Sequence, residues 1–308
     1  MRIMFMGTPE IASAVLEAIA DAGEDIVAVV TQPDKPKGRG YTMTPPPVKV
    51  TAEKLGLPVS QPDRIKTDEF RAYLDAVDPE LIIVVAYGKI LPDFVLDKPK
   101  YGCVNAHASL LPKYRGAAPI QRAIMDGERE TGVTAMYMDA GLDTGDMILT
   151  RRVEIADDDD FAIVHDKLAK AASEAMVETI KQIKDGNVTR TPQPEGFTYA
   201  HKIEDADMVL DFGENAKRLH DKIRALTPSA YTKTPDGKRL RVIASEYDIN
   251  ACENSAAGTV ASVSGGKIAV KCGAGTLYIT KCQPEGKRPM AASDLVNGRR
   301  VKVGDILG

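Results

Sequence analysis

Residues 80–86 read Glu-Leu-Ile-Ile-Val-Val-Ala, a short run dominated by branched apolar side chains. Such a run is too short and too uniformly apolar for a surface helix, and it is typical of a strand buried on both faces of a parallel sheet. Similar runs occupy 2–6, 26–31 and 102–106, and amphipathic segments alternate with them up to about residue 155. This alternation predicts an α/β fold with a mainly parallel, Rossmann-like sheet.

Two helices of this first domain can be predicted from local signals. One is expected over 10–22, with Thr8 as its N-cap and Pro9 at its first helical position. The other is expected from about 161 to 185, where apolar residues recur at helical spacing.

The remainder of the chain predicts a second, smaller domain. The stretch 190–208 contains prolines and no periodicity, which is typical of a linker. We therefore expect a catalytic domain over 1–189 and a second domain over 209–308. After a helix near 214–226, short strands separated by Gly-rich turns indicate a small OB-like β-barrel; they lie at 239–246, 257–263, 267–272 and 276–282.

The composition excludes several classes of protein. A chain of 308 residues, 44% of them hydrophobic, can bury one large core and a smaller one. No stretch approaches the roughly 20 apolar residues of a membrane span, and the apolar start breaks too early for a signal peptide. Isolated cysteines lack the spacing of a zinc or redox site: Cys103, Cys252, Cys272 and Cys282. We expect a soluble, cytoplasmic monomer that binds neither a metal nor a membrane.

Charge is distributed unevenly along the chain, although the net charge is only −4. Residues 1–208 hold 24 Lys and Arg against 34 Asp and Glu, a net charge of −10. Residues 209–308 hold 16 against 10, a net charge of +6. The basic end is therefore the part of the chain that can bind a polyanion.

The densest group of residues able to do chemistry follows the predicted strand 102–106. Asn105 and His107 are two positions apart, so they point to the same side at the carboxyl edge of the sheet, where open α/β sheets bind ligands. A carboxamide and an imidazole can both hydrogen-bond a carbonyl oxygen as it becomes an oxyanion. Taken alone, such a pair more often marks a structural histidine. The rigid Leu-Leu-Pro and Tyr-Arg-Gly-Ala-Ala-Pro that follow favour a functional site.

A second loop, over 139–146, reads Asp-Ala-Gly-Leu-Asp-Thr-Gly-Asp and follows the expected strand 131–138. Its glycines are expected to adopt positive φ angles and to let the backbone approach a ligand. Three aspartates could also bind calcium, but the twelve-residue spacing and the terminal Glu of an EF-hand are missing.

These motifs occur in the order Asn-x-His, Ser-Leu-Leu-Pro and Asp-x-Gly-x-Asp-x-Gly. In this the chain resembles the folate-dependent formyltransferase family. The resemblance implies a catalytic trio of Asn105, His107 and Asp143, with 10-formyltetrahydrofolate as co-substrate. It also implies a tetrahydrofolate site and a loop against the pterin ring, formed by Ser109, Leu110, Leu111 and Pro112 and by Tyr87, Gly88, Lys89, Ile90 and Leu91. The chain departs from the family in having no tryptophan, which members often carry in place of Tyr114.

A basic insertion within 31–49 carries Lys35, Lys37 and Arg39 among glycines and prolines. Such a segment can form a cationic hairpin that grips phosphates, although a solvated surface loop has the same composition. The insertion resembles the tRNA-contacting loop of methionyl-tRNA formyltransferases, and the basic second domain resembles the barrel of that subfamily. The resemblance implies transfer of the formyl group of 10-formyltetrahydrofolate to the amino group of methionine on initiator methionyl-tRNA.

Three other functions are compatible with parts of this sequence. A formyltransferase acting on a small amine, such as a nucleotide sugar or glycinamide ribonucleotide, would not need the basic insertion or the basic second domain. A nucleotide-dependent dehydrogenase would need a G-x-G-x-x-G fingerprint, which Gly-Thr-Pro-Glu at 7–10 does not supply. An RNA-binding protein with an inactive formyltransferase domain would leave the intact trio unexplained.

Overall fold

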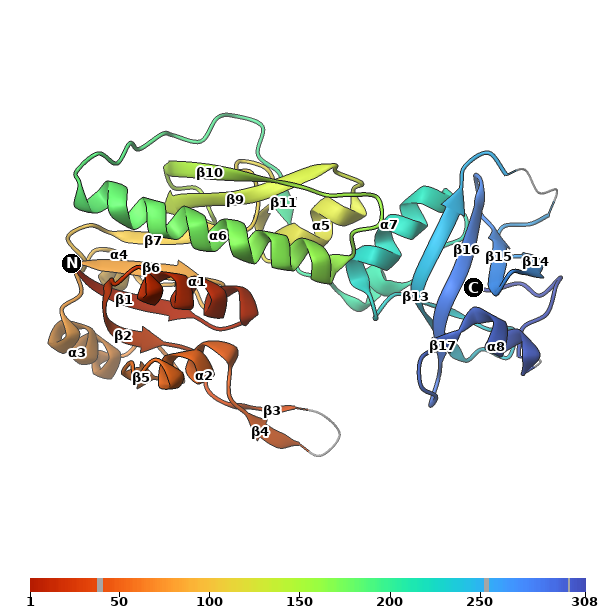
Figure 1. The fold of residues 1–308 in the computed structure, drawn as a ribbon, viewed down its shortest axis with the longest axis horizontal. Helices are drawn as coiled ribbons and strands as arrows, with labels where there is room; N and C mark the ends of the chain where they lie inside the picture. Colours follow the sequence, from red (N-terminus) through yellow and green to blue (C-terminus); the bar gives the residue numbers. More distant parts are fainter. Residues whose placement is uncertain (38–40, 252–254, 299) are drawn as a thin grey trace. The chain divides into compact units, whose positions relative to one another are not determined.

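The computed structural model describes residues 1–37, 41–251, 255–298 and 300–308 (Figure 1). These residues form two compact units, and each contains its own sheet. The first unit comprises Met1–Gly116, Glu130–Glu154 and His165–Ala200. The second comprises Ala117–Arg129, Ile155–Val164 and His201–Gly308.

Seven strands of the described residues form the sheet of the first unit, in the order β10-β9-β7-β6-β1-β2-β5. Neighbours from β7 to β5 are parallel, whereas β9 and β10 are antiparallel to their neighbours. This confirms the expected mainly parallel α/β sheet. The strands are β1 (Arg2–Gly7), β2 (Asp25–Val30), β5 (Val59–Ser60), β6 (Leu81–Val85), β7 (Cys103–His107), β9 (Glu130–Tyr137) and β10 (Met147–Glu154).

Helices of the first unit lie between these strands along the chain, except for the last helix, which follows β10. They are α1 (Glu10–Asp21), α2 (Pro47–Lys54), α3 (Asp68–Val77), α4 (Asp93–Leu96) and most of α6 (Phe161–Lys184). The expected N-cap of α1 was wrong by one residue. Pro9 is the N-cap, and the Thr8 hydroxyl donates instead to the Tyr87 carbonyl at 3.1 Å, because it faces the loop after β6.

Two short strand pairs complete this unit. A hairpin joins β3 (Lys35–Lys37) to β4 (Thr42–Thr44). Strands β8 (Arg115–Gly116) and β11 (Tyr199–Ala200) pair in parallel. No periodicity in the sequence predicted a strand at 199–200.

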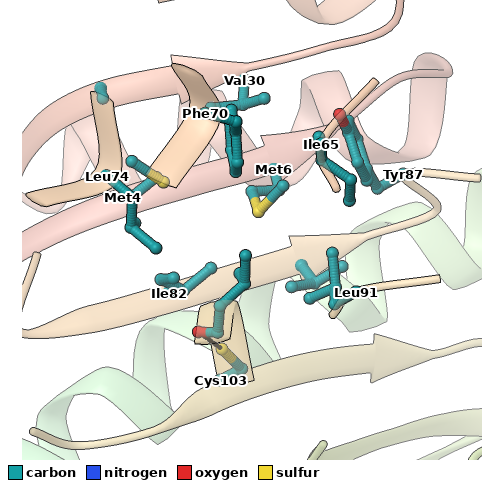
Figure 2. Packing of buried hydrophobic residues seen from close by; sticks show 13 residues of the cluster. Met4, Met6, Val30, Ile65, Phe70, Leu74, Ile82, Tyr87, Leu91 and Cys103 are labelled. Carbon is teal, nitrogen blue, oxygen red and sulfur yellow. Dashed lines mark hydrogen bonds between the residues drawn. The ribbon is translucent and has the colours of Figure 1, made fainter. Parts of the chain in front are cut away.

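One face of the sheet packs against α3 and α4 through a cluster that includes Met4, Ile82 and Phe70 (Figure 2). Cys103, at the start of β7, belongs to this cluster. Successive side chains of a strand alternate between faces, so Asn105 and His107 continue the same face toward the carboxyl end of β7. The face is thus apolar where the strand begins and polar where it ends.

The second unit is a small antiparallel β domain with helices, as the OB-like class predicted. Its sheet follows the order β12-β13-β16-β15-β14, and β17 pairs with β16. The elements are α5 (Pro119–Met125), a 3-10 helix η1 (Asp205–Met208), α7 (Ala216–Leu226), β12 (Tyr231–Lys233), β13 (Arg239–Asp248), β14 (Val260–Ser264), β15 (Lys267–Lys271), β16 (Thr276–Pro284), β17 (Met290–Ala291) and α8 (Ala292–Asn297).

Candidate active site

His107 is the last residue of β7 and its side chain is 6% exposed. Its Nδ1 lies 3.6 Å from Oδ2 of Asp143, and its Nε2 lies 2.9 Å from the carbonyl oxygen of Tyr114. Both ring nitrogens therefore face acceptors. A neutral imidazole can donate to only one of them, whereas an imidazolium can donate to both.

Asn105 lies two residues earlier on the same face of β7, paired between Val84 of β6 and Met136 of β9. It is half-buried and lies near the carboxyl end of the strand. The strand register thus places Asn105 and His107 as expected, and the loop after β9 brings Asp143 to His107 from 36 residues further along the chain.

The Asp143 carboxylate is held by backbone groups. Its Oδ2 also accepts from the Gly116 amide at 2.8 Å, and the side chain is 15% exposed. Asp139 supports the same loop, because its carboxylate accepts from the Gly141 amide at 3.0 Å and from the Thr144 hydroxyl at 2.6 Å. One oxygen of Asp143 therefore joins the loop after β7 to the loop after β9.

The expected role of the loop glycines was wrong in its detail. The left-handed backbone lies at Asp143, with φ 53°, and neither loop glycine adopts a positive φ. Glycine is required at both positions because a side chain would not fit there. A Cβ at Gly141 would lie 2.0 Å from the Thr144 hydroxyl, and a Cβ at Gly145 would lie 1.9 Å from the Tyr137 carbonyl oxygen.

The segment Ser109–Pro112 is a rigid turn beside His107. The Ser109 hydroxyl donates to the Lys113 carbonyl at 2.6 Å. The Thr134 hydroxyl, on β9, donates to the Ser109 carbonyl at 2.7 Å and accepts from the Leu111 amide at 3.1 Å. Leu110 and Pro112 are half-buried, so they are the members of this turn that a ligand can touch.

The loop Tyr87–Leu91 leaves the carboxyl end of β6, beside β1, where the strand order reverses. Such a switch point is where open α/β sheets place ligands. Tyr87 and Leu91 are buried in the core, and burial raises the pKa of Tyr87 to about 12. Lys89 donates to the carbonyls of Pro62 and Asp63 at 2.9 and 2.7 Å. Ile90 is 93% exposed and presents an apolar surface.

The basic insertion forms the β3–β4 hairpin, which is anchored at its base. The Asp34 carboxylate accepts hydrogen bonds from Lys49 at 3.0 Å and from Gln61 at 2.7 Å. These bonds lower the pKa of Asp34, and the bond from Gln61 has the largest effect. Lys35 is exposed. Arg39 and the side chain of Lys37 lie outside the described residues.

The described residues supply neither a reactive thiol at Cys103 nor a group of metal ligands. Burial raises the pKa of Cys103 to about 12, which leaves it protonated and a poor nucleophile at neutral pH. Among residues 1–37, 41–251, 255–298 and 300–308, no three His, Cys, Asp or Glu side chains are grouped so that they could hold a metal ion. In the same part of the chain, no helix has the length and apolar character needed to cross a bilayer.

One group of contacts was not indicated by any sequence signal. Residues 191–200, in the stretch expected as a linker, contact both loops that carry the site. Gln193 donates to the carbonyls of Asp143 and Gly145 and accepts from Arg115. Glutamine in an aperiodic, proline-containing segment carries no pattern that could reveal such a role.

Comparisons with known proteins identify the family of this chain. The family model "Formyl transferase" matches residues 1–180, and "Formyl transferase, C-terminal domain" matches 202–300. The methionyl-tRNA formyltransferase of Geobacter metallireducens is 43% identical, with 100% of this chain and 99% of that protein covered. The one from Symbiobacterium thermophilum is 47% identical, with 99% and 94% covered.

A solved structure shows the same fold. The N-formyltransferase from Helicobacter canadensis, in complex with folinic acid and dTDP-3-aminofucose, matches with a TM-score of 0.65 and 18% identity over 92% of this chain and 98% of that one. Matching domains and full-length relatives thus show that this chain belongs to the methionyl-tRNA formyltransferase family of formyl transferases.

Proposed function

We propose that this protein transfers the formyl group of 10-formyltetrahydrofolate to the amino group of methionine on initiator methionyl-tRNA. The observation that carries the proposal is the His107–Asp143 pair at the carboxyl end of β7, in a chain whose full-length relatives bear this activity in their name. The protein would act as a monomer in the cytoplasm, with tRNA and a reduced folate as its substrates.

The residues present fit a folate. A flat heterocycle and its aromatic linker need apolar contacts beside the reacting edge of the sheet. The almost fully exposed Ile90 offers such a contact, and Leu110 offers another. Gly88, with φ 81°, lets the backbone turn out of the sheet next to the strand-order reversal. We assign the folate site to these loops, 87–91 and 109–112.

In the mechanism we propose, the folate supplies the formyl group and the protein stabilises charge. The neutral α-amine of methionine attacks the formyl carbon, so a C–N bond forms while the bond from that carbon to folate N10 breaks. An α-amino group titrates near 7.7–8.0, so an appreciable fraction is already nucleophilic at neutral pH. No covalent enzyme intermediate is needed.

Asn105 and the Nδ1–H of a protonated His107 would donate hydrogen bonds to the carbonyl oxygen as it gains negative charge. Nδ1 can do so because Nε2 is held by the Tyr114 carbonyl and Nδ1, 3.6 Å from Asp143, is beyond hydrogen-bond distance of that carboxylate. Asp143 would orient the imidazole by its charge, since the Tyr114 carbonyl holds the opposite nitrogen. The proton lost by the attacking amine would pass through this pair to the leaving nitrogen.

The remainder of the chain would bind the tRNA. The family models match on either side of residues 181–201, which supports our division into a catalytic domain over 1–189, a linker over 190–208 and a tRNA-binding domain over 209–308. The net charge of +6 after residue 208 and the lysines of the β3–β4 hairpin suit a polyanionic acceptor.

The test is a formylation assay with 10-formyltetrahydrofolate and four acceptors in parallel: charged initiator tRNA, charged elongator tRNA, a dTDP-amino sugar and glycinamide ribonucleotide. We expect formylation of initiator methionyl-tRNA with the highest kcat/KM. If either small amine is formylated with a higher kcat/KM, methionyl-tRNA is not the acceptor. If the protein binds tRNA but formylates none of the four acceptors, it is an RNA-binding protein with an inactive formyltransferase domain.

A further inference from the structure

Residues 191–200 pack along both loops of the active site. Thr191 forms an antiparallel bridge with Met147, just after the Asp143 loop. At the other end, the Thr198 hydroxyl accepts from the Tyr114 amide at 2.9 Å, and its carbonyl accepts from the Arg115 amide at 2.9 Å. The segment is therefore fixed to the loop after β9 and to the loop after β7.

Gln193 lies between these two attachments and contacts both loops with one side chain. Its Nε2 donates to the carbonyl oxygens of Asp143 at 2.8 Å and Gly145 at 2.9 Å. Its Oε1 accepts from Nε and Nη2 of Arg115 at 3.0 and 2.6 Å. The partners determine the orientation of the amide, because carbonyl oxygens only accept and a guanidinium only donates.

Arg115 is 8% exposed, and its guanidinium also lies 4.9 Å from the ring centre of Phe197. It is therefore held in place on two sides. Because Gln193 is bound to this fixed guanidinium, its hydrogen bond also fixes the backbone carbonyl of Asp143. Asp143 has a φ of 53°, which is unfavourable for a residue with a side chain. A loop with such a conformation keeps it only when its surroundings enforce it.

We propose that Gln193, held by Arg115, is a positioning residue for catalysis. By binding the carbonyls on either side of Thr144, it keeps the Asp143 carboxylate beside His107 and the Gly116 amide. Its side-chain hydrogen bonds go to Arg115 and to the backbone at Asp143 and Gly145, so it acts through the residue it positions. This role rests on the proposed function and extends it to a residue outside the trio.

The first variants to test are Gln193→Ala and Gln193→Glu, with Gln182→Ala as a matched control. Gln182 donates to Glu178 one turn earlier on α6 and contacts neither loop through any contact that the structure describes. We expect Gln193→Ala to lower kcat up to about 100-fold, as for a small misplacement of a catalytic group, with both KM values unchanged. Gln193→Glu keeps the acceptor for Arg115 but cannot donate, so we expect a loss at least as large.

Two further measurements separate positioning from a general loss of structure. In an Asp143→Asn background, Gln193→Ala should cause no further loss of kcat, because the group it positions has already been changed. Hydrogen exchange in peptides covering 136–146 should be faster in Gln193→Ala than in Gln182→Ala.

The proposal is overturned if Gln193→Ala retains kcat within about twofold, or if its loss multiplies with that of Asp143→Asn. Unchanged hydrogen exchange overturns it as well. If the wild-type protein fails to formylate methionyl-tRNA, the proposed function fails, while the exchange comparison still decides whether Gln193 holds the loop.

Discussion

At the scale of single residues, the proposed catalysis depends on donors whose positions are set by strand β7. We expect Asn105→Ala and His107→Ala each to lower kcat by about 10²- to 10³-fold, the usual cost of losing one oxyanion donor. Affinity for the tRNA should stay within about twofold, because neither side chain is assigned to tRNA binding. Single-turnover formylation measures the first quantity and filter binding the second.

A matched control for this experiment is His165→Ala. His165 lies on α6, outside the strand and loops that carry the site, and contacts Asp166, so its loss removes an imidazole from elsewhere in the chain. Near-wild-type turnover by Asn105→Ala and His107→Ala would remove both residues from the mechanism.

A second residue-scale prediction concerns His220, in the second unit. Burial lowers its pKa from the ordinary value of 6.5. The neutral ring is satisfied in the fold, since Nε2 can donate to the Asp157 carbonyl at 3.3 Å and Nδ1 can accept from the Ser245 hydroxyl at 3.0 Å.

The unfolded chain therefore binds a proton that the folded chain does not, and His220 lowers the free energy of unfolding as the pH falls below about 6.5. His220→Gln should flatten this dependence between about pH 5 and 7. Urea unfolding at a series of pH values measures it. Parallel pH profiles for the variant and the wild type would contradict the assignment.

At the scale of elements, the loop 139–146 depends on glycine for space. Gly145→Ala should lower kcat strongly, since its Cβ would lie 1.9 Å from the Tyr137 carbonyl and the loop must shift away from His107. Gly213→Ala is the control, because the three atoms nearest to its Cβ would belong to the side chain of Asp211, at 3.1 Å or more. Steady-state kinetics of both variants decide the point; a fully active Gly145→Ala would show that the loop position does not matter.

The β3–β4 hairpin is the element we assign to phosphate contacts. Replacing Lys35 and Lys37 with Gln should weaken tRNA binding and reduce the slope of log K against log salt by about 1 per lysine. The KM for the folate should not change. Lys54→Gln, on α2, removes one lysine charge from an exposed position outside the hairpin and is compared with each single hairpin variant, Lys35→Gln or Lys37→Gln. An equal slope for the single hairpin variants and this control would argue against the assignment.

At the scale of the whole molecule, segments distant in sequence combine into the second unit. Within it, Arg224 is buried and donates to the Asp159 carbonyl at 2.8 Å and to Asp221 at 2.9 Å, while Arg122 pairs with Asp207 at 2.8 Å. These contacts tie 155–164 and 117–129 to the chain after residue 200.

Arg224→Met should therefore destabilise this unit by about 3 kcal/mol, because it removes the buried hydrogen bond to the Asp159 carbonyl and one of the two ion pairs of the buried Asp221. Arg218→Met removes an exposed pair with Glu214 on the same helix and should cost at most about 0.5 kcal/mol. Thermal unfolding of the two variants compares them, and equal melting temperatures would contradict the role given to Arg224.

Local pattern by itself determined the α/β sheet, the small β domain and the pairing of Asn105 with His107. The reason is physical: strand alternation and buried apolar runs are properties of adjacent residues, and a period of two places positions 105 and 107 on one face. The motif resemblance added Asp143 to this pair, which no local rule could have done.

Only the tertiary structure decided how the site is held. The position of Asp143 depends on an amide at Gly116 and on a side chain at Gln193, 27 and 50 residues away from it. In this loop Asp143 adopts the left-handed conformation and the glycines do not, because these distant contacts hold the backbone of Asp143 in place. Hydrogen bonds between remote segments leave no periodicity in the sequence, so no pattern in residues 191–200 predicted their contacts with the loops of the site.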